Sequence, residues 1–333
     1  MSQACRFSVV VVNLNGGPLL SRALSSAVAA GVPAEAMFVI DNGSVDRSAD
    51  DAERLHPGCH VIRNGCNLGF ARAVNKGLKQ ITTEFALLLN NDAELEPQAI
   101  EALTAAFDCH QRAALLGGRL LHPDGRRLHS VSALPTLAAE VLPRPLRRWT
   151  PGAAAARLAE RSDHGPPLAV PSVSGAALAV RMSAAADFGM LDEEFFFYFE
   201  ETEWCLRAAR HGWQVLYVPQ ARVRHAHGAT ARRYGALARI EYQRSKLTYF
   251  RKIGTGTYRL ACAVLWSKAM INGLSHVVAA ALTLGMVDSV RRKAGVWTRI
   301  WLWLLSGRPE GTGLPGKPRP RTRGVSGGGK LSH

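Results

Sequence analysis

The first 120 residues of the chain alternate short apolar runs with longer stretches in which apolar side chains recur at helical spacing. Two stretches, 19–30 and 71–81, have the helical spacing, and Gly31 and Gly77 stand near their ends. The apolar runs are brief and nearly continuous, as in strands buried on both faces of a parallel sheet, and they occupy residues 9–12, 37–40, 60–62 and 85–89. This alternation predicts an α/β domain.

Polar residues follow each of the four apolar runs. The segments are Asn13-Leu14-Asn15-Gly16-Gly17, Asp41-Asn42-Gly43-Ser44-Val45-Asp46, Arg63-Asn64 leading to Asn67-Leu68-Gly69, and Asn90-Asn91-Asp92. Because parallel strands end at one edge of a sheet, where ligands bind, these segments are expected to meet there. Asn, Asp and Gly also make ordinary turns, so one such segment alone indicates little. Four together favour a shared binding edge.

The middle of the chain has a less regular pattern. Residues 122–168 are rich in Pro, Ala and basic residues and predict a long mobile insertion. A lid, an acceptor loop or an insertion without a function would all fit. Regular structure resumes at 170–180, where the small residues around Gly175 would let a ligand approach the backbone. A helix is expected from near Glu200 to Gly212, followed by a strand at 214–218.

Several acidic residues and two histidines are candidates for catalysis or metal binding. Asp92 directly follows a strand, so it could hold Mg²⁺ or Mn²⁺ or simply cap a helix. The segment FFFYFEETE at 195–203 places aromatic residues before glutamates, and burial there would raise the pKa of a general base. Glutamates in the first turn of a helix are also favoured by its dipole, which lowers their pKa. His225 and His227 are possible third ligands of a metal.

These motifs together resemble glycosyltransferase family 2, in particular its bacterial rhamnosyltransferase-like branch. The similarity extends in order over about residues 7–255, and it rests on the four strand-end segments, on Ala71, Asn75 and Gly77, on Ser174-Gly175-Ala176 and on residues 196–207. It implies a GT-A fold with a mostly parallel mixed sheet, and an inverting, metal-dependent transfer from a nucleotide-sugar.

The resemblance also implies roles for individual residues. The segment Asn13, Leu14 and Asn15, together with Asp41, would contact the base and ribose of the donor, with Asn67, Gly69 and Gly175 nearby. Asn91 and Asp92 occupy the position of the family's Asp-x-Asp motif, so Asp92 would be its only carboxylate ligand, with His225 or His227 completing the metal site. Glu201 falls at the position of the catalytic base, where the family usually has Asp.

Composition separates the chain into two parts. The whole chain has a formal net charge of +15, but residues 1–221 hold 20 Lys and Arg against 23 Asp and Glu, whereas residues 222–333 hold 21 against 3. A basic end of this kind suggests contact with a polyanion, either nucleic acid or an anionic membrane. The six cysteines show no C-x-x-C spacing, and the start of the chain lacks the apolar region of a secretory signal, so we expect a cytoplasmic location.

The pattern of the basic end favours a membrane over nucleic acid. Residues 235–256 predict a basic amphipathic helix. Residues 269–287 are an uncharged stretch that is marginal for crossing a bilayer, so a helix on the membrane surface or packed against protein is preferred. Trp301 and Trp303 would suit the headgroup region. We therefore expect a catalytic domain at 1–230, a membrane-associating helical extension at 231–306 and a disordered basic tail at 307–333.

The predicted function is the transfer of one sugar, with dTDP-rhamnose as the expected donor, to a polyprenyl-diphosphate-linked saccharide in cell-envelope polysaccharide synthesis. The Gln-x-x-Arg-Trp motif of processive family members is absent, because Arg148-Trp149 lacks the preceding Gln. The expected place is the cytoplasmic face of the inner membrane, with peripheral attachment and without nucleic acid as a partner. The alternatives are an inactive relative that binds sugar nucleotides and, less favoured, a nucleic-acid-binding protein.

Overall fold

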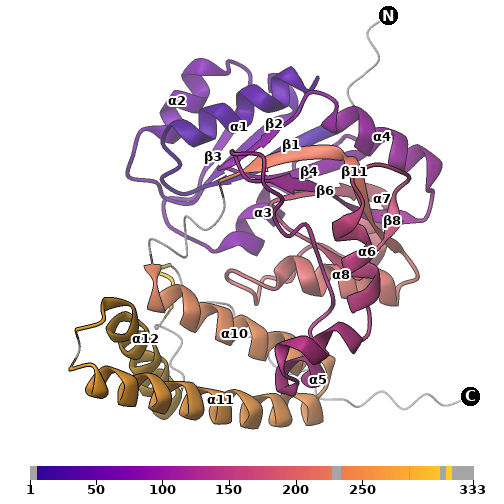
Figure 1. Cartoon of the computed structure of the whole chain (residues 1–333). Helices are drawn as coiled ribbons and strands as arrows, with labels where there is room; N and C mark the ends of the chain where they lie inside the picture. Colours follow the sequence, from indigo (N-terminus) through magenta and orange to yellow (C-terminus); the bar gives the residue numbers. More distant parts are fainter. Residues whose placement is uncertain (1–5, 227–233, 285, 308–312, 317–333) are drawn as a thin grey trace, which may run out of the picture.

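The structure of the chain, a computed structural model, describes residues 6–226, 234–284, 286–307 and 313–316. An α/β part built around one sheet occupies one side of the molecule, and three long helices from the C-terminal third lie together below it (Figure 1). The two parts meet at the segment that precedes helix α8 (Glu200–Arg210).

A mixed sheet forms the centre of the α/β part. Its strands run in the order β3 (His60–Arg63), β2 (Met37–Asp41), β1 (Phe7–Asn13), β4 (Phe85–Asn90), β10 (Ala177–Arg181), β6 (Ala113–Leu121), β11 (Gln214–His225) and β5 (Ala93–Leu95), and β8 (Leu168–Ala169) also pairs with β11. The first four strands are parallel, β10 is antiparallel to both of its neighbours, and β6 and β11 are parallel again. The expected mostly parallel mixed sheet is therefore confirmed.

The four apolar runs at the start of the chain form β1, β2, β3 and β4, as predicted. For β3 the expectation of burial on both faces is wrong: His60 and Arg63 are exposed and the two residues between them are half-buried. The reason is that β3 is the edge strand of the sheet and has a neighbour on one side only.

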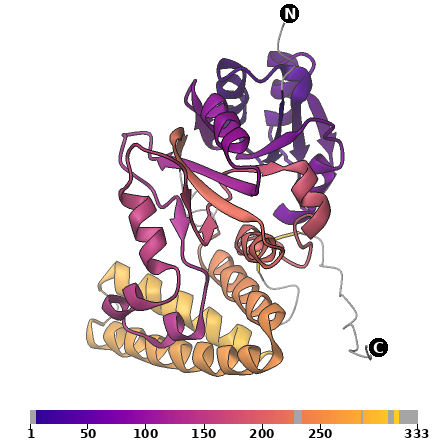
Figure 2. The same cartoon turned by 90° about the vertical axis from the view of Figure 1, so that its right-hand side faces the viewer.

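Helices cover both faces of the sheet (Figure 2). One face packs against α1 (Pro18–Ala29), α2 (Ser48–Leu55) and α4 (Ala99–Cys109), and the other against α3 (Phe70–Leu78), α7 (Met182–Phe188) and α8. A short 3₁₀ turn, η1 (Ala34–Ala36), leads into β2. Gly77 lies within α3 and allows close packing on β1, since a Cβ atom there would be 2.5 Å from Val10 Cγ1.

The segment 122–168, predicted as a long mobile insertion, contains regular elements. These are β7 (Val131–Ser132), which pairs with β9 (Ser172–Val173), and then α5 (Leu137–Val141), η2 (Arg144–Trp149), α6 (Ala153–Arg161) and β8. Glu140 of α5 forms ion pairs with two lysines of the C-terminal helices, Lys246 at 2.7 Å and Lys268 at 2.9 Å. Contacts so distant in sequence are not visible in the local pattern that predicted an irregular segment.

The C-terminal third forms α10 (Ala236–Ile253), α11 (Thr255–Leu282) and α12 (Asp288–Leu305). The helix predicted over 235–256 is present as α10, and the structure adds that much of it is covered by protein. Leu247, Tyr249 and Phe250 are buried in a cluster that also contains Phe195 and Phe199 from the segment before α8. Neighbours on several sides enclose α10, so most of its length is covered by protein.

The two tryptophans expected at lipid headgroups pack inside this helical part instead. Trp303 is 3% exposed. Trp301 donates a hydrogen bond from Nε1 to the carbonyl of Ala269 at 2.6 Å, and Gly273 leaves room for the indole ring, since a Cβ there would lie 2.2 Å from it. Of the helices that the structure describes, none combines the length and the apolar character needed to cross a bilayer.

Candidate active site

A cavity of about 560 Å³ lies at the sheet edge where β1 and β4 end. Its walls come from these strand ends, from the loop before α3, from the segment before α8 and from the end of β11. The predicted site residues that line it are Leu14, Asn15, Asn67, Gly69, Asn91, Asp92, Gly175, Glu201 and His225. The strand-end motifs therefore meet at one edge, as expected, and Asn13 and Asp41 lie behind this wall.

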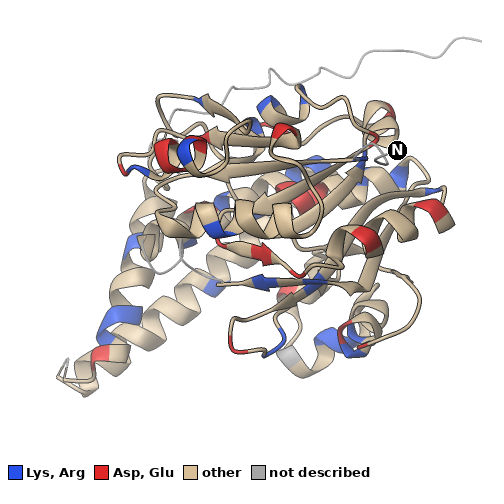
Figure 3. Ribbon diagram, turned by 90° about the horizontal axis from the view of Figure 1, so that it is seen from above, with Lys and Arg blue, Asp and Glu red and all other residues tan. Residues whose placement is uncertain are grey.

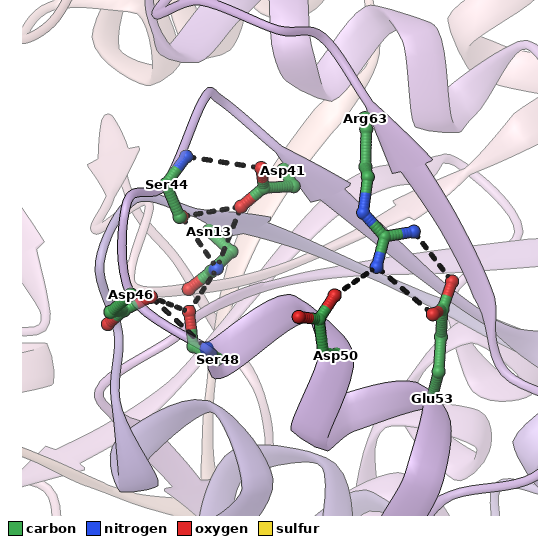
Figure 4. A network of polar contacts seen from close by, with 8 residues as sticks. All are labelled: Asn13, Asp41, Ser44, Asp46, Ser48, Asp50, Glu53 and Arg63. Atoms are coloured by element: carbon green, nitrogen blue, oxygen red, sulfur yellow. Dashed lines mark hydrogen bonds and ion pairs between the residues drawn. The ribbon is translucent and has the colours of Figure 1, made fainter.

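Asn13 ties the ends of β1, β2 and β4 together, and Figure 4 shows its contacts with Asp41, Ser44 and Ser48. Its buried amide Nδ2 lies 3.0 Å from Asp41 Oδ1, 3.0 Å from Ser44 Oγ and 2.8 Å from Ser48 Oγ. Its Oδ1 accepts a hydrogen bond from Asn91 Nδ2 at 3.1 Å. In this arrangement Asn13 and Asp41 hold the cavity wall in place, and direct contact of Asp41 with a donor stays a prediction.

The loop after β1 is held in an unusual backbone conformation. Asn15 has φ 54°, a left-handed value that Asn tolerates better than most residues. Its backbone N–H donates to Ser44 Oγ at 2.9 Å, and its side-chain Oδ1 accepts from the Val45 N–H at 2.8 Å. The loops after β1 and β2 thus support each other at the rim of the cavity.

A second group of hydrogen bonds, made by the side-chain amides of Asn42 and Asn67, orders the loop before α3. Asn42 Nδ2 donates to the carbonyl of Gly69 at 3.1 Å and lies 3.3 Å from Asn67 Oδ1, which also accepts from the Gly69 N–H at 3.0 Å. Gly69 has φ 88°, and a Cβ there would lie 2.7 Å from Phe196. Asn42 lines the cavity but was not among the predicted site residues, although it belongs to the strand-end segment that contains Asp41.

Asp92 and His225 face each other across the cavity wall. Asp92 Oδ1 lies 3.0 Å from His225 Nε2, and each side chain is 9% exposed. They meet because β5, which follows Asp92, pairs antiparallel with the end of β11, and the backbone N–H of Ala226 donates to the Asp92 carbonyl at 3.0 Å. Asn90 Nδ2 approaches His225 Nε2 at 3.3 Å. The alternative ligand His227 lies outside the described residues.

This pair fits a divalent cation that takes its remaining ligands from a bound substrate. Among the described residues there is no group of three or more His, Cys, Asp or Glu side chains arranged to hold a metal. Mg²⁺ and Mn²⁺ sites in nucleotide enzymes often use one or two carboxylates and complete their shell with phosphate oxygens and water. One carboxylate and one imidazole at the cavity wall agree with that type of site.

Glu201 stands at the start of α8, beside Gly175 of the loop before β10. A Cβ at Gly175 would lie in ordinary van der Waals contact with the Glu201 side chain, at 3.5 Å, and both residues line the cavity. Burial raises the pKa of Glu201, while the backbone N–H groups of Glu201 and Thr202 lower it less. The sequence left the burial effect and the helix-end effect open, and in the structure burial is the larger. A carboxylate with a raised pKa is suited to accept a proton near neutral pH.

The other two glutamates of the motif have different surroundings. Glu203 points away from the cavity and forms an ion pair with Arg207 at 2.8 Å, and Arg207 also donates to the carbonyls of Phe188 and Met190. Glu200 is buried and lines the cavity next to Glu201.

The backbone before α8 is strained. Tyr198 and Phe199 have φ values of 73° and 69°, in the left-handed region that aromatic residues rarely adopt. Tyr198 lines the cavity, whereas Phe199 belongs to the buried cluster of the C-terminal helices. These two neighbouring residues therefore connect the cavity to the helical part.

Two residues of the described tail segment 313–316 line the same cavity. Leu314 and Pro315 are among its lining residues, and Asn67 Nδ2 donates to the Pro315 carbonyl at 2.8 Å. The sequence predicted disorder from residue 307 onward. For 313–316 the structure shows a defined contact with the catalytic domain, which composition alone could not reveal because it depends on a partner almost 250 residues away.

The family and the fold of this protein follow from its similarity to known proteins. Residues 8–154 match the family described as glycosyl transferase family 2. Two solved structures share the fold at low sequence identity: the mannosyltransferase PcManGT from Pyrobaculum calidifontis in complex with GDP-Man and Mn²⁺, and GalNAc-T7 with UDP, GalNAc and Mn²⁺. The first has a TM-score of 0.52 and 15% identity over 92% of this chain and 87% of that one, and the second has 0.51 and 17% over 73% and 50%. These likenesses confirm the GT-A fold.

A curated relative narrows the family assignment. The chain is 31% identical over 234 residues to the N-acetylglucosaminyl-diphospho-decaprenol L-rhamnosyltransferase of Mycobacterium tuberculosis, covering 65% of this chain and 75% of the relative. A hexosyltransferase of Haloferax volcanii, Agl10, is 26% identical over 52% of each chain. This chain belongs to glycosyltransferase family 2 and resembles its rhamnosyltransferases.

Proposed function

We propose that the enzyme transfers a single rhamnose, with inversion, from dTDP-rhamnose to a hydroxyl of a polyprenyl-diphosphate-linked saccharide. The observation that carries the proposal is the placement of Glu201 in one cavity with the Asp92–His225 pair. The choice of sugar and acceptor follows the mycobacterial relative, whose name states rhamnosyl transfer to N-acetylglucosaminyl-diphospho-decaprenol. Cell-envelope polysaccharide synthesis is the corresponding process.

The mechanism needs one displacement. The Glu201 carboxylate accepts the proton of the acceptor hydroxyl, whose oxygen then attacks the anomeric carbon of the donor from the face opposite the diphosphate. The bond between that carbon and the diphosphate oxygen breaks, and its electron pair leaves with the nucleotide. The new glycosidic bond therefore has the inverted configuration, without a covalent intermediate.

The strand-end residues would position the donor for this step. Asn13 and Asp41 hold the loops that carry Leu14, Asn15 and Asn42, and these loops would enclose the base and ribose. Asp92 and His225 would hold Mg²⁺ or Mn²⁺, and a bound divalent cation would stabilise the negative charge that develops on the leaving diphosphate. Asn91, anchored on Asn13, would border the same site.

Substitution of the two neighbouring glutamates tests the assignment of the base. We expect Glu201→Gln to lower kcat by about 10²- to 10⁴-fold, the usual contribution of a general base, while the Kd for the donor stays within about twofold. Glu101→Gln, an exposed position on α4, is the matched control. A large loss in Glu200→Gln together with a nearly normal Glu201→Gln would transfer the role to Glu200. Unchanged transfer in both variants would contradict carboxylate base catalysis in this cavity.

A screen of donors and acceptors tests the substrate assignment. Purified enzyme is incubated with dTDP-rhamnose or with UDP- and GDP-sugars, and with N-acetylglucosamine linked through diphosphate to a short prenyl chain. Release of dTDP together with a rhamnosylated product is the expected result. Transfer from UDP-sugars alone would overturn the choice of rhamnose, and binding of nucleotide-sugars without any transfer would favour an inactive binding relative.

Attachment to the cytoplasmic face of the inner membrane is part of the proposal. Helix α11 exposes an apolar row to solvent, with Ile271 69% and Leu274 58% exposed and Leu282 80% exposed near its end. Exposed apolar area on this scale marks a contact surface. Arg291, Arg292 and Lys293 at the start of α12 supply positive charge that an anionic lipid surface would attract.

A further inference from the structure

A second cavity, of about 370 Å³, lies between the C-terminal helices and the segment 122–168. Its polar wall carries Arg147 of η2, Arg239 and Lys246 of α10, and Lys268 of α11. One carboxylate, Glu140 of α5, is the acidic residue among the described residues that line it. Four cations against one carboxylate leave a strongly positive chamber.

The arrangement of these charges favours a bound anion. Lys246 is 7% exposed, and burial lowers its pKa while Glu140 opposes that change. The carboxylate of Glu140 is shared by both lysines, at 2.7 Å and 2.9 Å, so it can neutralise only one positive charge. Lys246 is buried and Lys268 is half-buried, so the positive charge that Glu140 leaves over would be stabilised by a bound anion. Arg147 and Arg239 are more exposed and stand where such a ligand could enter.

The remaining wall of the cavity is apolar and aromatic. Leu265 of α11 and Trp297, Ile300 and Leu304 of α12 line this side. A simple anion would not require such a surface, whereas a ligand with a phosphate group and a hydrocarbon chain would use both sides. In Figure 3 acidic segments are spread over the α/β part, while α11 and α12 contain one acidic residue in all, Asp288.

Aromatic contacts connect this cavity to the active site. Tyr242 lines the second cavity, and its ring lies 5.6 Å from that of Tyr198, which lines the first. It also lies 5.1 Å from the ring of Phe199, directly before α8. These contacts place Tyr242 between the two sites. Burial raises the pKa of Tyr242, and the carboxylates of Glu140 and Glu201 raise it further.

We propose that the second cavity binds the diphosphate of a lipid-linked acceptor and the first part of its prenyl chain. This inference rests on the proposed function and adds the place where the acceptor is bound. The phosphates are contacted by Arg147, Arg239, Lys246 and Lys268, and the prenyl chain is contacted by the apolar side of the cavity. The saccharide then extends past Tyr242 and Tyr198 toward Glu201. A diphosphate diester carries two negative charges, and the four cations exceed the single carboxylate by three positive charges, so the bound diphosphate would be neutralised.

Acceptor kinetics with paired substrates test this site. The variants are Arg239→Gln and Lys268→Gln, and the control is Arg259→Gln, an exposed arginine of α11 outside the cavity. Each is assayed with N-acetylglucosaminyl-diphospho-geraniol and with the octyl glycoside of the same sugar. We expect KM for the diphosphate acceptor to rise about tenfold in each cavity variant, as for loss of one charge-assisted hydrogen bond, and to stay unchanged for the octyl glycoside. Equal effects on both acceptors, or on neither, would overturn the site.

Direct binding separates this inference from the proposed function. Geranyl diphosphate is titrated into the full chain with excess dTDP and UDP present, and fluorescence of the tryptophans, two of which line the cavity, reports binding. Saturable binding that weakens about tenfold in Arg239→Gln but not in Arg259→Gln supports the site even if no sugar transfer is found. Lack of binding by the unaltered protein, or equal binding of geraniol, would overturn it even if transfer occurs.

Discussion

The two cavities of this enzyme are built in different ways. The first is made by strand ends, where buried amides such as Asn13 and Asn42 bond to residues of neighbouring loops. The second is made by helices, where charged side chains from α5, α10 and α11 meet around Glu140. The strand-end site depends on neutral hydrogen bonds in a fixed register, and the helical site on an excess of positive charge.

This difference indicates how each region responds to change. In the sheet, one amide joins several loops, so its removal should affect both stability and donor binding. In the helical part, side chains at the cavity and on the outer surface can change without exposing the core. Substitutions in the first region should therefore act on turnover and folding, and those in the second on affinity for acceptor and membrane.

The largest effect is expected at the metal site. Asp92→Asn should lower kcat/KM for the donor about 10³-fold, because it removes the carboxylate expected to hold the cation beside the leaving diphosphate. Initial rates over a series of Mn²⁺ and Mg²⁺ concentrations measure it. The control is Glu94→Gln, two residues further along, whose side chain pairs with Arg22. A normal metal response in Asp92→Asn would show that the cation is held elsewhere.

The second-largest effect is expected in the hydrogen-bond network around Asn13. Asn13→Ala should lower the free energy of unfolding by about 3 kcal/mol, because it leaves the buried Asp41 carboxylate and the Asn91 amide without their shared partner. Denaturant unfolding followed by circular dichroism measures it. Asn272→Ala is the matched change in α11, where the side-chain amide donates to the carbonyl one turn earlier within the described part of the chain, and it should cost about 0.5 kcal/mol or less. Similar losses of unfolding free energy at both positions would contradict this difference between the two regions.

Membrane binding should respond to the outer face of α11 and not to the surface of the α/β part. The double variant Ile271→Glu and Leu274→Glu should lower partitioning onto vesicles of anionic phospholipid at least about tenfold, since it removes exposed apolar area and adds negative charge. Cosedimentation at low and high salt measures it. Leu55→Glu on α2, a residue 49% exposed, is the control in the α/β part and should bind normally. Equal loss in both proteins, or in neither, would contradict attachment through α11.

The smallest expected effect is a displacement in the pH profile. Burial raises the pKa of Glu201 above its ordinary 4.5, so the acid limb of kcat against pH should lie above that value. Activity is lost as pH falls through the raised pKa, because the base becomes protonated. An acid limb at or below 4.5 would contradict the role of Glu201 as base.

The contribution of Glu201 to stability should change with pH in the direction opposite to that of activity. The folded state binds the Glu201 proton more tightly than the unfolded state, so the contribution of this group to stability is fully present below the unfolded pKa and is lost as pH rises through the folded pKa. Glu201→Gln should therefore be more stable than the unaltered protein at neutral pH, with the difference shrinking at acid pH. Denaturant midpoints at several pH values measure it, and a constant difference would contradict the raised pKa.

The sequence predicted most of the donor side. The four apolar runs and the polar segments after them identified β1 to β4 and six of the predicted site residues that line the first cavity. That prediction succeeded because strand and turn signals are local and parallel strands end at the same edge. Asn42 was missed as a site residue, although its segment was identified, because only the structure shows which side of the loop faces the cavity.

The helical part was predicted less well for a physical reason. Helical periodicity shows that a segment is helical, but the partner that covers each face comes from elsewhere in the chain. Thus Trp301 and Trp303, expected at lipid, pack within the protein, and the insertion 122–168 supplies Glu140 to two distant lysines.

The chain's own sequence determined the α/β class, the order of the donor motifs, the concentration of positive charge after residue 221 and the resemblance to glycosyltransferase family 2. The tertiary structure alone decided that burial outweighs the helix end at Glu201, that Asp92 meets His225, and that cations from two helices and the η2 turn surround a second cavity. Local propensity is a property of neighbouring residues, whereas burial and charge pairing depend on which distant segments pack together.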